Sequence, residues 1–139
     1  MGRLTWEITT ELFDNMGLTI LCISRISPAQ ITRNLVLEQA GYRVLATDDA
    51  AHAEKLFRDD LISAVIFGET MRADDRIELG TAFKQMKPSV PILFLYKMNG
   101  FRVPPGIADE QVEFLGGPKL LLQALNRLLG DGKNQRDDE

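Results

Sequence analysis

The 139-residue sequence predicts a single α/β domain, a doubly wound parallel sheet of five strands with helices on both faces. From residue 18 onward, short apolar runs alternate with amphipathic stretches, which is the pattern of βα units around such a sheet. The run 62–67 is almost continuously apolar, as in a central strand covered on both faces. With 45% hydrophobic residues, the chain can build a core without metal ions or disulfides. The expected strands are 18–23, 42–47, 62–67, 90–96 and 111–115.

The first helix is predicted between the first two strands. Ser27 can cap it, Pro28 suits its first turn, and Gln30 completes a capping box. Gly41 is a natural residue to end it. The apolar residues expected to face the core are Ile31, Leu35, Val36 and Ala40.

Two further helices follow the second and third strands. The second begins at a cap formed by Asp48 or Asp49. The third covers 73–86, is capped by Asp74 or Asp75, and ends before Pro88. The apolar faces of the two helices are expected to consist of Ala53, Leu56, Phe57, Leu79, Ala82, Phe83 and Met86.

The regular alternation is interrupted between the fourth and fifth strands. A helix is due there, but Pro104 and Pro105 remove amide donors and clash with a preceding helical turn. We expect a loop, or at most a short helical turn around 107–110. The last helix opens at Gly117-Pro118 and closes at Gly130. Its apolar stripe is expected to consist of Leu121, Leu122, Leu125, Leu128 and Leu129.

The chain is expected to divide into an N-terminal extension (1–17), the domain itself (18–130) and a disordered polar tail (131–139). Apolar residues in the extension fit a strand and a helix equally well, so periodicity does not decide its structure. No stretch approaches the roughly 20 apolar residues that span a membrane. The single cysteine, Cys22, is expected to be buried in the first strand, and we expect a cytoplasmic protein.

The charge pattern argues against a nucleic-acid partner. The formal net charge is −4, and the 16 lysines and arginines are scattered along the chain instead of forming a basic stripe. His52, the one histidine, has no cysteine or second histidine near it in sequence, and we expect a solvated helix residue there.

Residues 18–129 resemble the receiver domains of bacterial two-component response regulators. The likeness rests on the order of elements and on the phrases at 40–44, 60–67 and 90–92. It implies a flavodoxin-like sheet with strand order 2-1-3-4-5, in which the usual fourth helix is here shortened or replaced by a loop. Receivers bind Mg²⁺ and accept a phosphoryl group on an aspartate, which requires converging carboxylates.

The positions that carry this chemistry in receivers are all altered here. The acidic pair after the first strand corresponds to Ser24 and Arg25, and the phosphoacceptor to Gly68. The hydroxyl residue after the fourth strand corresponds to Tyr96, and the lysine after the fifth to Gly117. The resemblance therefore implies a degenerate pseudo-receiver that is not an enzyme and uses no Mg²⁺, other metal or cofactor.

Nearby acidic residues are not expected to restore the lost site. Glu69 follows Gly68, but adjacent strand residues point to opposite faces. Asp74 and Asp75 are explained by helix capping. Arg25 either pairs with Glu69 or lies in solvent.

Three classes of function remain open. The favoured one is a signalling module that binds a protein partner or a second copy of itself. Its interaction face would consist of Tyr96, Met98, Phe101, Arg102 and Val103, unless Phe101 and Val103 pack back over the sheet. The second class is a domain regulated by a small anion or nucleotide at Ser24, Arg25 and Ser27, beside a helix N-terminus. The third, a flavodoxin-like enzyme, lacks a phosphate-binding loop.

Overall fold

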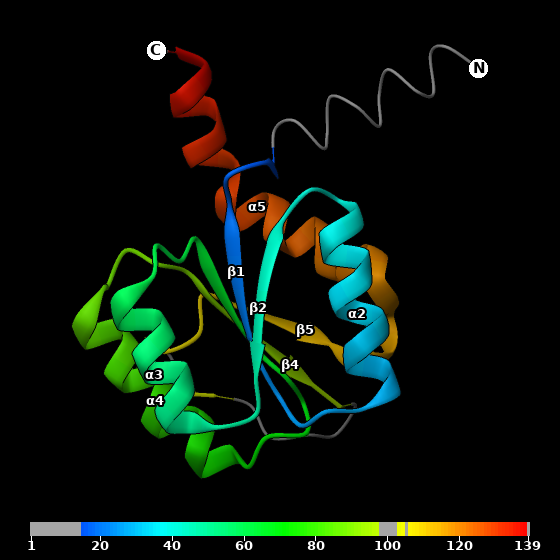
Figure 1. Ribbon diagram of the computed structural model, residues 1–139, viewed down its shortest axis with the longest axis vertical. Coiled ribbons are helices and arrows are strands. Elements are labelled where there is room, and N and C mark those ends of the chain that lie inside the picture. The colour runs from blue at the N-terminus through cyan, green and yellow to red at the C-terminus, as the bar shows by residue number, and fades with distance from the viewer. Residues whose placement is uncertain (1–14, 98–102, 105, 139) are drawn as a thin grey trace.

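The computed structural model describes residues 15–97, 103–104 and 106–138, and it contains the predicted sheet (Figure 1). All strand pairs are parallel and the order is β2-β1-β3-β4-β5. This confirms the predicted fold class and strand order. The strands are β1 (Thr19–Ile23), β2 (Arg43–Thr47), β3 (Ala64–Phe67), β4 (Ile92–Tyr96) and β5 (Glu110–Glu113).

Helices cover both faces of the sheet. Helices α2 (Pro28–Gln39) and α5 (Gly117–Asp138) lie on one face, and α3 (Ala50–Asp59) and α4 (Ala73–Met86) lie on the other (Figure 1). Each face has its own apolar cluster, one including Leu37 and Leu125 and the other including Phe57 and Phe83. Because both faces are covered, every residue of β1 and β3 is buried.

The inward face of α2 differs from the predicted one. Ile31 and Leu35 are 53% and 52% exposed, whereas Gln30 and Leu37 are buried. The prediction was wrong because apolar residues occur on nearly all sides of this helix, so spacing alone could not select the buried side. The caps were correct: Ser27 Oγ accepts a hydrogen bond from the Gln30 amide, and Gly41 follows the helix with a positive φ of 106°.

Helices α3 and α4 bury four of the predicted apolar residues, Ala53, Phe57, Leu79 and Phe83, and pack Leu56 and Met86 partly against the same cluster, whereas Ala82 is outside it. The two helices differ in their caps. Asp49 caps α3 by accepting from the Ala51 amide. The residue that precedes α4 is Arg72, which forms no side-chain cap, so the predicted capping by Asp74 or Asp75 was wrong. Both aspartates lie in the first turn, where the helix dipole favours negative charge.

The connection between β4 and β5 contains no helix among its described residues, 97, 103–104 and 106–109. It packs over the α3/α4 face instead: Val103 is 6% exposed, and Ile107 and Ala108 contact the same cluster. Gly80 of α4 makes room for it, because a Cβ there would lie 2.7 Å from Ile107 Cγ2. The short helical turn expected around 107–110 is absent, since Glu110 already begins β5.

Helix α5 runs to Asp138, so the predicted helix end at Gly130 was wrong. Residues 131–138, expected to be a disordered tail, continue the helix. Lys133, Gln135 and Arg136 are good helix formers, but the aspartates, Asn134 and Gly132 are poor ones, so helix propensity alone does not explain why the helix continues. The predicted extension falls largely on residues 1–14, outside the described residues, and the division of the chain into three segments stays a prediction.

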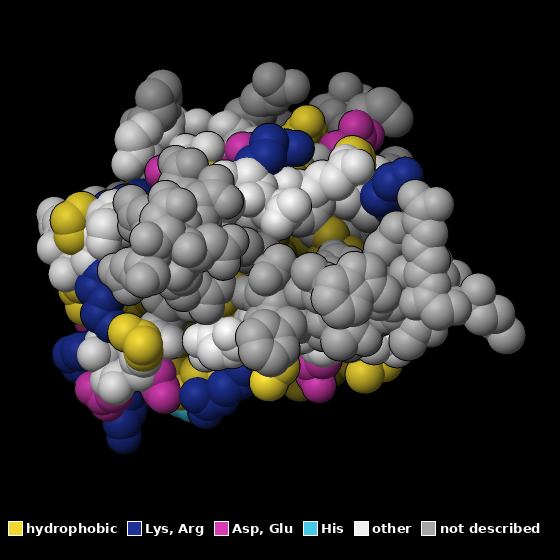
Figure 2. Space-filling model, turned by 90° about the horizontal axis from the view of Figure 1, so that it is seen from above, with side chains coloured by type: hydrophobic (Ala, Val, Ile, Leu, Met, Phe, Trp, Pro, Cys, Tyr) yellow, Lys and Arg dark blue, Asp and Glu magenta, His cyan; other side chains and the backbone are white. Residues whose placement is uncertain are grey.

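None of the helices in the described part of the chain has the length and apolar content needed to cross a bilayer. Figure 2 views the end of the molecule at which α5 finishes. Among the described side chains on that face, basic and acidic groups are interspersed.

Candidate functional site

The carboxyl ends of β1 and β3 lie side by side, and Ser24 contacts Gly68 there. The register pairs Ile23 with Phe67, and the Gly68 amide donates to the Ile23 carbonyl at 2.8 Å. A Cβ built on Gly68 would lie only 2.2 Å from Ser24 Cβ, well inside van der Waals contact. In this arrangement position 68 has no room for a side chain.

An ion pair fills the space beside Gly68. Arg33 extends from α2, and its Nη1 donates to Glu69 Oε2 at 3.3 Å. The two side chains are 11% and 3% exposed, so the pair is almost removed from water. Arg33 Nη2 would also lie 3.3 Å from a Cβ at position 68. The guanidinium therefore packs directly against the site that the resemblance assigns to the phosphoacceptor.

A second buried arginine approaches from the opposite face of the sheet. Arg76 of α4 is 5% exposed, and its Nη1 donates to the Leu95 carbonyl at 2.7 Å. Its guanidinium carbon lies 5.6 Å from the centre of the Phe94 ring. Burial lowers the pKa of Arg76 from its ordinary value, while the negative charge of Glu69 acts in the opposite direction.

We call Ser24, Arg33, Gly68, Glu69 and Arg76 the strand-end cluster. It contains two guanidinium groups and one carboxylate, so one positive charge is in excess. Two of its buried polar atoms, Ser24 Oγ and Arg76 Nε, have no hydrogen-bond partner in the structure. A buried unsatisfied polar group typically costs about 1–3 kcal/mol, so the cluster is not optimised for stability.

The predicted anion pocket is not assembled in the structure. The Ser24 hydroxyl is closed off from solvent, whereas Arg25 is exposed and its amide donates to Thr70 Oγ1 at 3.1 Å. Ser27 Oγ is already used as the α2 cap. Arg25 also forms none of the ion pairs found among the described residues, and Arg33 takes the expected place beside Glu69.

Three of the remaining predicted positions, Tyr96, Val103 and Gly117, are described by the structure. Tyr96 ends β4, half-buried and opposite Glu113 in the ladder. Gly117 begins α5 with a φ of 80°. Met98, Phe101 and Arg102 lie outside the described residues. Val103 is buried, so its prediction as an exposed interaction residue was wrong, and the alternative that it packs back over the sheet is correct.

The cluster does not fit Mg²⁺, the ion that the fold would suggest. Mg²⁺ prefers oxygen ligands in octahedral geometry, usually from more than one carboxylate. The cluster offers only Glu69, which is already bonded to Arg33. Across the described residues, no group of three or more Asp, Glu, His or Cys side chains is placed to hold a metal ion. His52 is exposed, and its Nδ1 lies 2.9 Å from Thr47 Oγ1.

The sequence interpretation missed both buried arginines, although the helix spacing contained a signal for them. Gln30, Arg33 and Leu37 stand at i, i+3 and i+7, which places them on one face of α2. Arg76 has the same spacing to Leu79 and Phe83 on α4. An arginine on the apolar face of each of two helices is a sign that a carboxylate lies beneath them.

Several solved structures of response regulators and their receiver domains have the same fold. A CheY-like response regulator receiver domain from Methanospirillum hungatei JF-1 aligns with a TM-score of 0.72 and 16% identity, covering 86% of this chain and 98% of that one. Chemotaxis response regulator CheY4 of Vibrio cholerae gives 0.69 and 20%, covering 81% and 98%. A chain from the complex of histidine kinase ThkA with response regulator protein TrrA also gives 0.69 and 20%, again covering 81% and 98%.

No protein-family model and no curated protein sequence matches the chain. The likeness to the solved structures therefore establishes that the chain has the flavodoxin-like fold of CheY-type receivers.

Proposed function

We propose that this chain is an atypical receiver-like signalling module that acts by protein–protein contact, without phosphorylation of an aspartate. The observation that carries the proposal is the contact between Ser24 and Gly68, closed on one side by the Arg33–Glu69 pair. The place where a receiver would hold its acceptor carboxylate is packed with protein atoms.

The chemistry of phosphoryl transfer supports the same proposal. The transfer needs a nucleophilic oxygen and cations that neutralise the charge spreading over the phosphoryl group. The Glu69 side chain is 3% exposed and its charge is compensated by Arg33, so its oxygens are poorly accessible to an incoming phosphoryl group. The proposed module is therefore not an enzyme and binds no Mg²⁺.

A protein partner is favoured by an exposed apolar patch, which we call the α2 patch and define as Ile31 and Leu35 of α2 together with Ile26 from the loop that precedes the helix. Ile26 is 74% exposed, and Ile26 and Ile31 line the same shallow hollow. Ile31 and Leu35 are one helical turn apart, so their side chains are neighbours. Large apolar side chains gathered on one exposed face are typical of interaction sites.

The nature of the partner is suggested by a structural neighbour. In one neighbour, a response regulator protein is in complex with a histidine kinase. We propose that the α2 patch contacts a signalling protein that brings complementary apolar side chains, with a second copy of this chain as the alternative partner.

Incubation with acetyl phosphate and Mg²⁺ tests the phosphorylation-independent part of the proposal. We expect the intact mass of the protein to stay unchanged under conditions in which a competent receiver gains one phosphoryl group. A single phosphoryl adduct on an acidic side chain would overturn the proposal.

Substitutions on two exposed apolar residues test the contact surface. Ile31→Glu places a charge in the α2 patch, and Leu61→Glu places the same charge on a residue that is 87% exposed and lies outside the patch, in the connection between α3 and β3. We expect a partner captured by the wild-type chain to be captured by Leu61→Glu but not by Ile31→Glu. Equal capture by both variants would exclude the α2 patch, and sedimentation of the purified chain would test self-association.

A further inference from the structure

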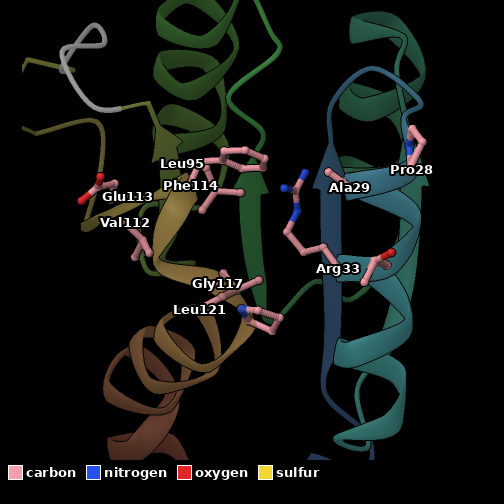
Figure 3. Close-up of a pocket in the computed structure, with 11 residues that line it drawn as sticks. Pro28, Ala29, Arg33, Leu95, Val112, Glu113, Phe114, Gly117 and Leu121 are labelled. Carbon is pink, nitrogen blue, oxygen red and sulfur yellow. The ribbon is translucent and has the colours of Figure 1, made fainter.

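A cleft of about 340 Å³ separates α2 from the start of α5 (Figure 3). Its floor is formed by Leu95 of β4 and Val112 of β5, and its walls come from the first turns of both helices. Its size lies at the lower end of the range of small-molecule sites in proteins. None of the residues proposed above for partner contact lines it.

The lining combines an apolar surface with one guanidinium. Leu95, Val112, Phe114 and Leu121 provide the apolar part. In Figure 3 the Arg33 side chain leaves α2 and extends across the cleft toward Leu95 and Phe114. Ligand sites commonly have this composition, in which apolar walls supply binding energy and a few polar groups fix orientation.

Arg33 has hydrogen-bonding capacity left after pairing with Glu69. A guanidinium has five N–H donors, and within the described chain the side chain of Arg33 donates one hydrogen bond, to Glu69. Arg33 and Glu69 cancel each other's charge, but Arg76 leaves the strand-end cluster with one positive charge in excess. A second acceptor on Arg33 is therefore electrostatically favourable.

The N-terminal ends of two helices add to the positive potential near Arg33. Helices α2 and α5 both begin at the cleft, where Pro28, Ala29, Gly117 and Pro118 are lining residues. Pro28 and Pro118 have no amide N–H and the Gln30 amide is bonded to Ser27, so the helix starts contribute mainly through the positive ends of their dipoles. The one acidic lining residue, Glu113, has its carboxylate on the opposite side of the cleft from Arg33 in Figure 3.

We propose that this cleft binds a small amphipathic carboxylate, with its anionic end on Arg33 and its apolar body against Leu95, Phe114 and Leu121. The carboxylate accepts from the free N–H groups of Arg33, and the body replaces water on the apolar walls. The inference goes beyond the proposed signalling role and does not depend on it. Such a ligand bridges α2 and the β5–α5 junction, and thereby stabilises the folded state.

Thermal unfolding with three matched probes tests the ligand chemistry. Octanoate carries both required features, octanol carries only the apolar chain, and acetate carries only the carboxylate. We expect octanoate to raise the melting temperature in a saturable manner, and the other two to have little effect at equal concentration. A rise as large with octanol or with acetate would overturn the proposal.

Two substitutions locate the site on the intact chain. Ala29→Trp fills the cleft from an exposed position of α2, and Gln39→Trp is its control at the exposed end of the same helix. Octanoate binding is expected to be lost only in Ala29→Trp. Arg33→Lys keeps the charge that pairs with Glu69 but removes the planar fork, and we expect about tenfold weaker octanoate binding, the equivalent of one charge-assisted hydrogen bond.

Amide chemical shifts give an independent readout. On titration with octanoate, the shift changes should concentrate at the cleft residues Ala29, Val112 and Leu121. Changes confined to other regions, or octanoate binding by Ala29→Trp equal to that of the control, would refute the assignment.

Discussion

The interiors of the strands and their carboxyl ends form two contrasting regions of one sheet. The interiors of the three inner strands, β1, β3 and β4, consist almost entirely of buried apolar residues. The ends carry a serine, a glycine and a carboxylate held between two arginines. The contrast teaches that this fold does not depend on a carboxylate directly after β3, because the sheet forms with Gly68 packed against Ser24 at that position.

The two regions also differ in what they contribute to stability. Apolar burial contributes about 25 cal/mol per Å² removed from water, so the strand interiors supply most of the favourable free energy. A buried ion pair contributes little net stability, because desolvation of the charges offsets their attraction. Removing one partner of such a pair is nevertheless costly.

The largest loss of stability is expected from a substitution in the apolar cluster that packs against the strand interiors. Phe83 stacks on Phe57 with ring centres 4.1 Å apart and lies 5.9 Å from Phe67. Phe83→Ala should lower the free energy of unfolding by about 3–5 kcal/mol, through lost burial and a residual cavity. Urea denaturation measures the change. The exposed Leu61→Ala should cost less than about 0.5 kcal/mol, and an equal loss would break the contrast drawn here.

Glu69→Ala is expected to cause the next largest loss of stability, and it tests the strand ends. It leaves Arg33 and Arg76 buried without their carboxylate, and we expect a loss of about 3 kcal/mol in the free energy of unfolding. The double variant Glu69→Leu/Arg33→Met should recover much of this loss, because the uncompensated charge of Arg33 is removed with its partner. If the double variant lost as much stability as the two single variants together, the side chains of Glu69 and Arg33 would not be coupled energetically.

The sequence predicted the strand interiors well because apolar runs bounded by turn residues reflect burial directly. The order of elements, the α3 and α4 faces and the loop between β4 and β5 all follow from such local patterns. The face of α2 could not be predicted in this way, since Ile31 and Leu35 mimic a buried stripe. The inward side of α2 is instead occupied by Gln30, Arg33 and Leu37, and Arg33 meets its partner Glu69 only after folding, 36 positions later in the chain.

The altered site was predictable only in part. Local sequence shows that Gly68 has no side chain, but not that Ser24 occupies the space beside it. The strand-end cluster is likewise built from residues that follow β1 and β3 and from residues on α2 and α4, which meet only after folding. Periodicity places an arginine on a helix face and does not tell which carboxylate it pairs with.

Gly68→Ala adds one carbon atom at the strand ends and tests how tightly they are packed. The added Cβ would meet Ser24 Cβ at 2.2 Å, so the strand ends must separate, and we expect a loss of about 2 kcal/mol. In a Ser24→Gly background the same substitution should cost less than half as much, because the colliding atom is gone. Denaturation of the four chains measures the coupling, and an unchanged cost in that background would exclude the steric explanation.

Cys22 tests how completely the interior excludes charge. Burial raises the pKa of its thiol to about 12 from an ordinary 9.0, with the positive charge of Arg33 acting in the opposite direction. Since the pKa is raised on folding, the contribution of the neutral thiol is complete below pH 9 and is lost as the pH rises toward 12. Between pH 8 and pH 10, the free energy of unfolding should fall in the wild type by about 1 kcal/mol more than it falls in Cys22→Ala. Parallel pH profiles for the two chains, or rapid thiol labelling of the folded protein at pH 8, would mean that solvent reaches β1.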